Sequence, residues 1–203
     1  MAYSVIKKPS DYFNTVLYTG NGSTNAQTGV GFQPDFTWIK SRSNAENHNL
    51  FDAVRGATKR IRSNGAEAED TRTTSLTAFD SDGFTLGSGS QVNTSGWTFA
   101  SWNWLGANGT SANTDGSISS TVSANTTSGF SIVKYTSTGT ANSTIGHGLN
   151  ATPTNVIIKC TSDGATSWIS KMKGADGYLY LNNTDALTSN STWLPTDANT
   201  FTL

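Results

Sequence analysis

FNTVLYTGNGSTNAQTGVGF at residues 13–32 and FSIVKYTSTGTANSTIGHGL at residues 130–149 are two copies of one pattern. An offset of 117 residues places Tyr18 on Tyr135, and further identities keep the same register. These are Gly22 with Gly139, Asn25 with Asn142, Gly29 with Gly146, and Gly31 with Gly148. A register held over so many positions indicates an internal repeat, and hence two related units in one chain.

The repeat continues beyond this stretch. After two extra residues in the second copy, Lys40 falls on Lys159, and later residues 84–86 match residues 201–203. The shared glycines are expected at turns that need a positive φ or a close backbone approach. The shared aromatic and aliphatic positions are expected in the core.

The domain organisation follows from the repeat. We expect a first β unit over residues 1–105, a connecting segment over 106–128, and a second β unit over 129–203 that is shortened at its C-terminal end. The connecting segment is rich in Gly, Ser, Thr and Asn, but Val122 repeats Val5, so its second half is predicted to form a strand.

Composition favours strands over helices. Charged residues make up 13% of the 203-residue chain, about half the roughly 25% of an average globular domain. Ser, Thr, Asn and Gly take their place, and these residues favour strands and tight turns. We therefore predict an all-β protein with two related β-sandwich (jelly-roll-like) units and no substantial helix. The predicted strands are 15–18, 35–41, 49–54, 59–62, 76–79, 84–86, 97–105, 131–135, 155–160, 167–172, 178–181 and 200–203.

A tryptophan-rich segment distinguishes the two copies. After Leu86 the first copy continues as GSGSQVNTSGWTFASWNWLG, which the second copy lacks. Alternation places Trp102 and Trp104 on one face of a strand that also includes Trp97. This strand belongs to the second unit, or a neighbouring chain supplies its equivalent, or the chain is a shortened piece. Because unpaired sheet edges are normally covered, the second alternative predicts a homo-oligomer in which this segment is exchanged.

No catalytic site is predicted. The two histidines, His48 and His147, accompany no nucleophile or metal-binding motif, and His147 aligns with Val30 of the other copy. The acidic residues within 67–70 are expected to form a solvated loop, because catalytic carboxylates need a defined separation in a cleft. We therefore expect a protein that is not an enzyme.

Charge and hydropathy exclude two further classes of partner. The net charge is −1 and no basic stripe is present, which argues against nucleic acid. Arg60 and Arg62, in the longest basic cluster, are expected on a solvated strand face. No stretch approaches the roughly 20 apolar residues of a membrane span, so we expect no membrane insertion.

No metal or cofactor is predicted either. The run Asp-Ser-Asp-Gly at residues 80–83 resembles the start of a calcium loop, but the later acidic ligand is missing, since Gln91 and Val92 stand there. A tight turn explains this run better. Cys160 is alone, so it forms no internal disulfide, and it is expected as a small buried residue.

A carbohydrate-binding function is the alternative that the sequence leaves open. Six tryptophans are present, and sugar rings stack on exposed aromatic faces. Trp38 and Trp168 lie in apolar strand patterns and are expected in the core. Trp193, within SNSTWLPTD, is the candidate for a glycan contact.

A family resemblance rests on six motifs taken as a set. SDYFNTVLYTGNG, GVGFQPDFTWIK, FDSDGFTLG, FASWNWLG, GFSIVKYT and GHGL resemble the repeat modules of tail-fibre and other virion structural proteins of marine tailed bacteriophages. The resemblance spans about residues 9–203. It implies a virion component, a tail fibre or a fibre or decoration on the capsid, which contacts other virion proteins and a host-surface glycan. It carries no catalytic residues.

The resemblance also implies how the protein is made and assembled. Lys7, Lys8 and Pro9 follow a short strand-like stretch, so no signal peptide is predicted, as expected for a virion protein made in the host cytoplasm. Copies of a virion protein meet around a symmetry axis. We expect a homo-oligomer, with a trimer favoured.

Overall fold

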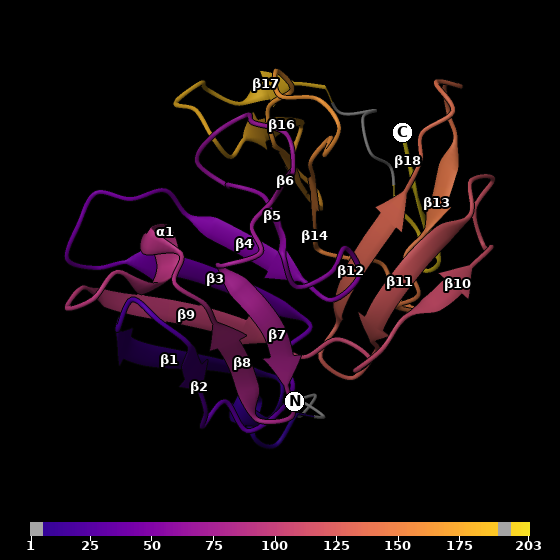
Figure 1. Cartoon of the computed structure of the whole chain (residues 1–203). Helices are drawn as coiled ribbons and strands as arrows, with labels where there is room; N and C mark the ends of the chain where they lie inside the picture. Colours follow the sequence, from indigo (N-terminus) through magenta and orange to yellow (C-terminus); the bar gives the residue numbers. More distant parts are fainter. Residues whose placement is uncertain (1–5, 191–195) are drawn as a thin grey trace.

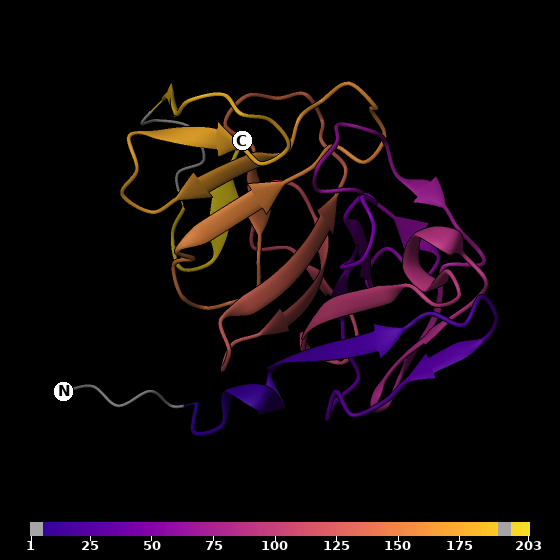
Figure 2. The same cartoon turned by 90° about the vertical axis from the view of Figure 1, so that its left-hand side faces the viewer.

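A computed structural model describes residues 6–190 and 196–203 of the chain. It confirms the predicted all-β fold. Helical structure in the described residues is limited to the 3-10 turn η1 (Pro9–Asp11) and the four-residue helix α1 (Ser90–Asn93). The strands form two units that lie side by side, the first in indigo to magenta and the second in orange to yellow (Figures 1 and 2).

The first unit is a sandwich of two antiparallel sheets with a small additional ribbon. In Figure 1 the three-stranded sheet lies in front of the four-stranded one. The four-stranded sheet has the order β1 (Phe13–Thr19), β9 (Thr98–Trp104), β3 (Phe36–Ser41), β4 (Asn49–Asp52). The three-stranded sheet has the order β2 (Asn25–Gln27), β8 (Gly83–Leu86), β7 (Leu76–Asp80), and the ribbon pairs β5 (Lys59–Arg60) with β6 (Asp70–Thr71).

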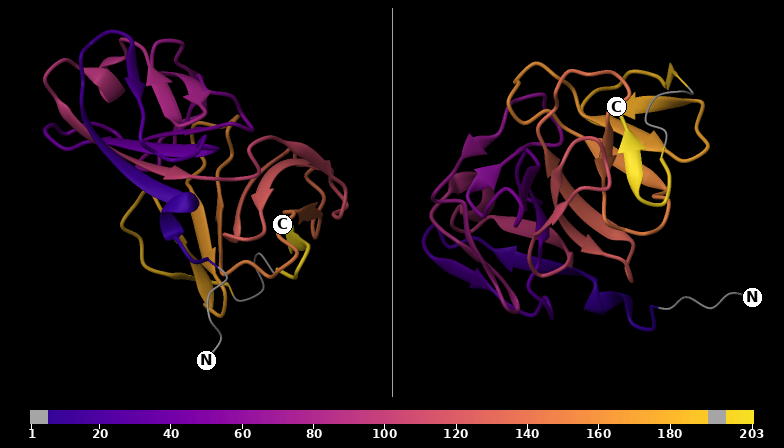
Figure 3. Two further views of the ribbon diagram at one scale, coloured as in Figure 1. Left: turned by 90° about the horizontal axis from the view of Figure 1, so that it is seen from below. Right: turned by 90° about the vertical axis from the view of Figure 1, so that its right-hand side faces the viewer.

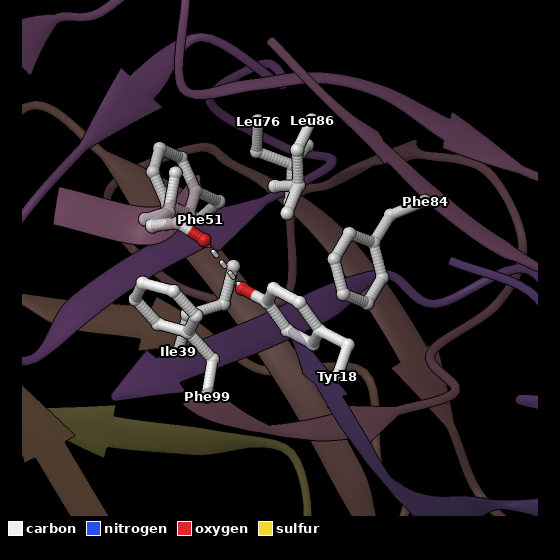
Figure 4. Close-up of a cluster of buried hydrophobic side chains, with 8 residues drawn as sticks. Tyr18, Ile39, Phe51, Leu76, Phe84, Leu86 and Phe99 are labelled. Atoms are coloured by element: carbon white, nitrogen blue, oxygen red, sulfur yellow. Dashed lines mark hydrogen bonds between the residues drawn. The ribbon is translucent and has the colours of Figure 1, made fainter. Parts of the chain in front are cut away.

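The core of the first unit fills the space between its two sheets, because alternate residues of each strand point inward. Tyr18 stacks on Phe99 with ring centroids 5.2 Å apart, and Phe84 meets the Tyr18 ring edge-on at 6.4 Å. The buried Tyr18 hydroxyl donates a 2.8 Å hydrogen bond to the Val92 carbonyl at the end of α1 (Figure 4). Burial raises the pKa of Tyr18 well above its usual value, so the hydroxyl keeps the proton that it donates.

Tyr18→Phe is expected to lower the free energy of unfolding by about 1–2 kcal/mol, because it leaves the buried Val92 carbonyl without its donor. The ring keeps its place on Phe99, so the substitution isolates the hydrogen bond. Urea denaturation followed by circular dichroism measures the change. A variant as stable as the wild type would show that the Val92 carbonyl finds another donor.

The predicted tight turn joins β7 and β8. The Asp82 carboxylate accepts hydrogen bonds from the backbone N–H groups of Gly29 and Gly31, at 3.0 and 2.6 Å. The hydrogen bond from Gly29, followed by the one from Gly31, lowers the pKa of Asp82. Gly29 and Gly31 have φ of +83° and +89°, as their conservation in both copies of the repeat suggested. Asp82 therefore holds a neighbouring loop.

The second unit contains three sheets. Its core centres on Ile145 and Phe201, and Val156 and Ile158 pack against it. The first two sheets are β10 (Ser111–Asn113), β11 (Ser120–Asn125), β12 (Phe130–Tyr135), and β13 (Thr144–Gly146) with β18 (Thr200–Thr202). The third is β14 (Asn155–Ile158), β15 (Ile169–Met172), β16 (Gly177–Tyr180), β17 (Thr188–Ser189).

The segment 106–128 does more than connect the units. Its second half forms the expected strand, β11, and its first half contributes the additional strand β10. Both belong to the sheet that contains β12. The segment is therefore part of the second unit's structure.

The tryptophan-rich segment forms β9, the second strand of the first unit's large sheet. It pairs with β1 on one side and with β3 on the other. The repeat makes β12 and β14 the counterparts of β1 and β3. Within the described residues no strand joins β12 to β14, and each lies at the end of its own sheet. The first of the three alternatives, that the tryptophan-rich strand belongs to the second unit, is therefore wrong, because β9 lies in the first unit's sheet.

All the predicted strands coincide with observed ones to within a few residues at their ends. The five strands that the sequence did not indicate, β2, β6, β10, β13 and β17, are two or three residues long. Runs this short carry too few alternating positions to produce a periodic signal.

Candidate functional site

The junction between the two units combines an apolar cluster with hydrogen bonds from both sides. Trp168, which precedes β15 of the second unit, is 5% exposed and packs against the first unit's Leu50 and Ile61. Its indole Nε1 donates a 2.7 Å hydrogen bond to the carbonyl of Arg62. Trp38 lies beside the same cluster. One aromatic side chain thus anchors the second unit on the outer face of the first unit's large sheet.

A second aromatic group extends the junction. The ring of Phe130, at the start of β12, stacks on Trp104 at 6.0 Å and meets Phe36 at 6.1 Å. Trp104 in turn contacts Phe13 at 4.8 Å. Phe13 and Phe130 are repeat counterparts, so both copies of this position contribute to one cluster.

Backbone groups complete the junction. The Lys159 ammonium donates to the Ala66 carbonyl at 2.9 Å, and the Glu69 N–H donates to the Thr161 carbonyl at 2.8 Å. Desolvation lowers the pKa of Lys159. Figure 3 shows from below how the β14–β17 sheet adjoins the first unit. Both units therefore contribute directional contacts that set their relative orientation.

The basic cluster is not the solvated face that the sequence predicted. Arg60 is 1% exposed, and its guanidinium binds both carboxylate oxygens of Asp70, the residue directly opposite it in the β5–β6 ribbon. A third hydrogen bond goes to the buried Asn49 side chain at 3.2 Å. Opposite charges on paired strands could have indicated this ion pair. Strands of only two residues, however, are too short to be paired from the sequence.

The acidic residues at 67–70 are all ion-paired, and Glu67 lies in an exposed loop as the sequence predicted, whereas Glu69 and Asp70 are half-buried. Glu67 lies 3.1 Å from the guanidinium of Arg62. Glu69 lies 3.1 Å from that of Arg55. These pairs surround the segment that Lys159 contacts, so they stabilise the first unit's side of the junction.

The chain passes from β9 to the second unit through a tight turn held by Asp35. One carboxylate oxygen of this fully buried residue accepts hydrogen bonds from the backbone N–H groups of Gly106 and Asn108, at 2.8 and 2.9 Å. Burial raises the pKa of Asp35, and the bonds from Asn108 and Gly106 offset part of the increase. The crossing between units is therefore fixed by a side chain of the first unit.

Asp35→Asn tests this arrangement through pH. Because the folded state raises the pKa of Asp35 above the unfolded value of about 3.9, the wild type binds an extra proton on folding. Its stability is favoured below that unfolded pKa and falls as pH rises through the raised folded pKa. Measured by denaturation between about pH 4 and pH 7, the wild type should lose stability relative to the variant as pH rises. A constant difference across this range would contradict the raised pKa.

The histidines have structural contacts. His48 Nδ1 accepts the indole N–H of Trp38 at 2.8 Å, and desolvation lowers the pKa of His48. His147 is buried, and its Nδ1 accepts the N–H of Leu149 at 3.2 Å. Cys160 is half-buried rather than enclosed in the core, since it follows the end of β14.

The four tryptophans predicted as site residues do not form one site among the described residues. Trp193, the candidate glycan contact, lies outside the described residues. Trp97 packs against the first core, and Trp102 faces Trp38 at a centroid distance of 6.4 Å. With Trp104 they belong to the first unit's own sheet, so strand exchange stays a prediction and requires β9 to leave two pairings.

Metal-binding clusters and membrane-spanning helices are both absent from residues 6–190 and 196–203. No group of three or more His, Cys, Asp or Glu side chains there is placed to hold a metal ion. No helix in this part of the chain is long and apolar enough to cross a bilayer. An open depression of about 300 Å³ lies at the edge of the junction, between Pro9, Tyr12 and Phe130. Its walls are largely aromatic and contain no titratable pair.

Comparison with known proteins gives one family. A model described as a domain of unknown function, DUF7483, matches residues 8–203. Neither the search of curated proteins nor the search of solved structures produced a match. The match spans both units and the junction between them, so the chain belongs to the DUF7483 family.

Proposed function

We propose that this protein is a non-enzymatic structural component of a phage virion, a tail fibre or a fibre or decoration on the capsid, which assembles as a homo-oligomer. The observation that carries the proposal is the junction itself. The second unit covers an apolar sheet face of the first with Trp168, and fixes the orientation with directional hydrogen bonds. Such contacts hold the two units of the chain in one arrangement, as expected of a rigid structural module.

The low charge and the hydroxyl-rich surface support the same role. A charged fraction of 13%, with a fold stabilised by two apolar cores, is compatible with a protein exposed outside a cell. The sheet edges of β12 and β14 have no partner strand among the described residues. In an assembly, a neighbouring subunit covers such edges.

The carbohydrate-binding alternative has less support. It depends on Trp193, which lies outside the described residues. The other five tryptophans are buried or half-buried. Trp38, Trp102 and Trp104 also contact other aromatic rings. Faces used in this way are not free for a sugar ring.

The test of the proposal is to locate the protein on the particle. An antibody raised against the purified chain is applied to density-purified particles of the phage that encodes it, and its position is read by electron microscopy. We expect regular labelling of the tail or of the capsid surface. Particles that carry no label, with the protein present only in the unassembled fraction of the lysate, would contradict a virion role.

A further inference from the structure

The β14–β17 sheet of the second unit exposes an apolar row on its outer face. Strand pairing places Ile157, Ser170 and Leu179 side by side. Ile157 is 47% exposed and Leu179 is 44% exposed. Alternation adds Met172, at 60%, to the same face. We call this surface the outer patch. It comprises Ile157, Met172 and Leu179, together with Leu181, the next alternate residue after Leu179, and Leu187, whose side chain adjoins Gly177 of the same face.

The outer patch is a concentration of apolar surface, not a scattering. Of the seven large apolar side chains that are exposed in the described residues, five belong to it. The other two, Phe13 and Leu17, are on β1 of the first unit. Single exposed apolar residues are ordinary, but a contiguous group on one sheet face marks an interaction surface.

The same face in the first unit is already covered. The repeat register makes Trp38, Leu50 and Ile61 the counterparts of Ile157, Ser170 and Leu179, since they pair across their strands in the same order. Trp168 of the second unit buries that row. The equivalent sheet face is therefore covered in the first unit and exposed in the second.

Charge does not oppose docking on the outer patch. The β14–β16 residues that share the face with the patch are Asn155, Ser170 and Gly177, none of which is charged. Lys171 points to the opposite side, where its ammonium donates to the Ala175 carbonyl at 2.8 Å. Burying the β14–β16 part of this face therefore desolvates no ion.

The first unit of another copy is poorly suited to cover the patch. The counterpart of Trp168 in the first unit is His48, because the N–H groups of both residues donate to the matching Asn182 and Asn64 side chains. His48 is engaged by Trp38 of its own unit. The first unit therefore offers no free aromatic anchor equivalent to Trp168.

We infer that two copies of the chain pack face to face through their outer patches, related by a two-fold axis. A two-fold contact uses the same surface on both copies and needs no second complementary site. One end of the patch adjoins the existing junction, because Leu181 donates its N–H to the Trp168 carbonyl at 3.1 Å. The contact would thus extend an apolar seam that already joins the units. The inference rests on the assembly role proposed above in taking the partner to be a second copy of this chain.

Sedimentation velocity over a range of protein concentrations tests the inference, with Met172→Glu and Leu17→Glu as a matched pair. The two side chains are equally exposed, at 60% and 61%, but Leu17 lies outside the patch. We expect the wild type to sediment as a dimer that dissociates on dilution. Met172→Glu should raise the Kd at least about tenfold, while Leu17→Glu should leave it within about twofold.

Leu179→Asp provides a second patch variant if Met172→Glu misfolds, and circular dichroism verifies the fold of each. A wild type that stays monomeric, or a dimer unaffected by either patch variant, would overturn the inference. A wild-type trimer would overturn the two-fold arrangement while agreeing with the homo-oligomer expected from the sequence. Particle labelling is independent of all these results, so failure of the virion role and failure of the docking surface remain distinguishable.

Discussion

Trp168→Ala is expected to lower the free energy of unfolding by about 3–5 kcal/mol, the range for truncation of a large buried aromatic side chain. The indole is 5% exposed, contacts Leu50 and Ile61 across the junction, and donates to the Arg62 carbonyl. Its removal leaves a cavity between the units and an unpaired carbonyl. Because the loss falls on the contact between units, the second unit should unfold at a lower denaturant concentration than the first.

The measurement is guanidinium denaturation followed by far-ultraviolet circular dichroism, since the substitution removes a fluorophore. Trp168→Phe keeps most of the apolar volume but loses the N–H donor, so its loss should be nearer 1–2 kcal/mol. Leu17→Ala, on the surface of β1, is the control for truncation without burial. A single transition with unchanged midpoint in Trp168→Ala would contradict the role of Trp168 as the anchor.

Asp70→Asn is expected to cost about 3 kcal/mol at neutral pH, because it leaves the buried Arg60 guanidinium without its counter-charge. Arg60 is 1% exposed and binds both oxygens of Asp70. Burial by itself would raise the pKa of Asp70, but the hydrogen bonds and charges of Arg60 and Arg72 outweigh it and hold the pKa below its usual value.

The pH dependence gives an independent check. With a lowered folded-state pKa, Asp70 contributes stability that is present above the unfolded pKa of about 3.9 and is lost as pH falls through the folded value. The difference between wild type and Asp70→Asn should therefore shrink on acidification below about pH 4. Arg60→Met combined with Asp70→Leu should recover much of the loss. A double variant as unstable as Asp70→Asn would show that the pair does more than neutralise a buried charge.

The repeat and the turn at residues 80–83 were predictable because both depend on local pattern. Turn residues and alternation act over a few positions, and an internal repeat is found by comparing the sequence with itself. The strand that carries Trp102 and Trp104 was also predictable from alternation. The position of this strand in the sheet was not predictable, because its pairing with β1 and β3 joins residues that are far apart in the sequence.

The ion pair between the buried Arg60 and the half-buried Asp70 could not be predicted from composition. A basic cluster is usually solvated, and only the pairing of β5 with β6 places the two charges opposite each other. The same holds for Asp35, whose partners Gly106 and Asn108 belong to the turn that leads to the second unit. Burial of a charge depends on contacts distant in sequence, which no local pattern encodes.

The all-β class and the positions of the main strands are therefore consequences of the residue pattern alone, because strand alternation and turn chemistry are local. The tertiary structure decided which faces of those strands are covered. Trp168 and Ile157 both lie in apolar strand patterns in the sequence, yet one is buried at the junction and the other is exposed in the outer patch. The reason is physical: the two units are similar but not equivalent in position, and only the first has a neighbour in the same chain on its outer sheet face.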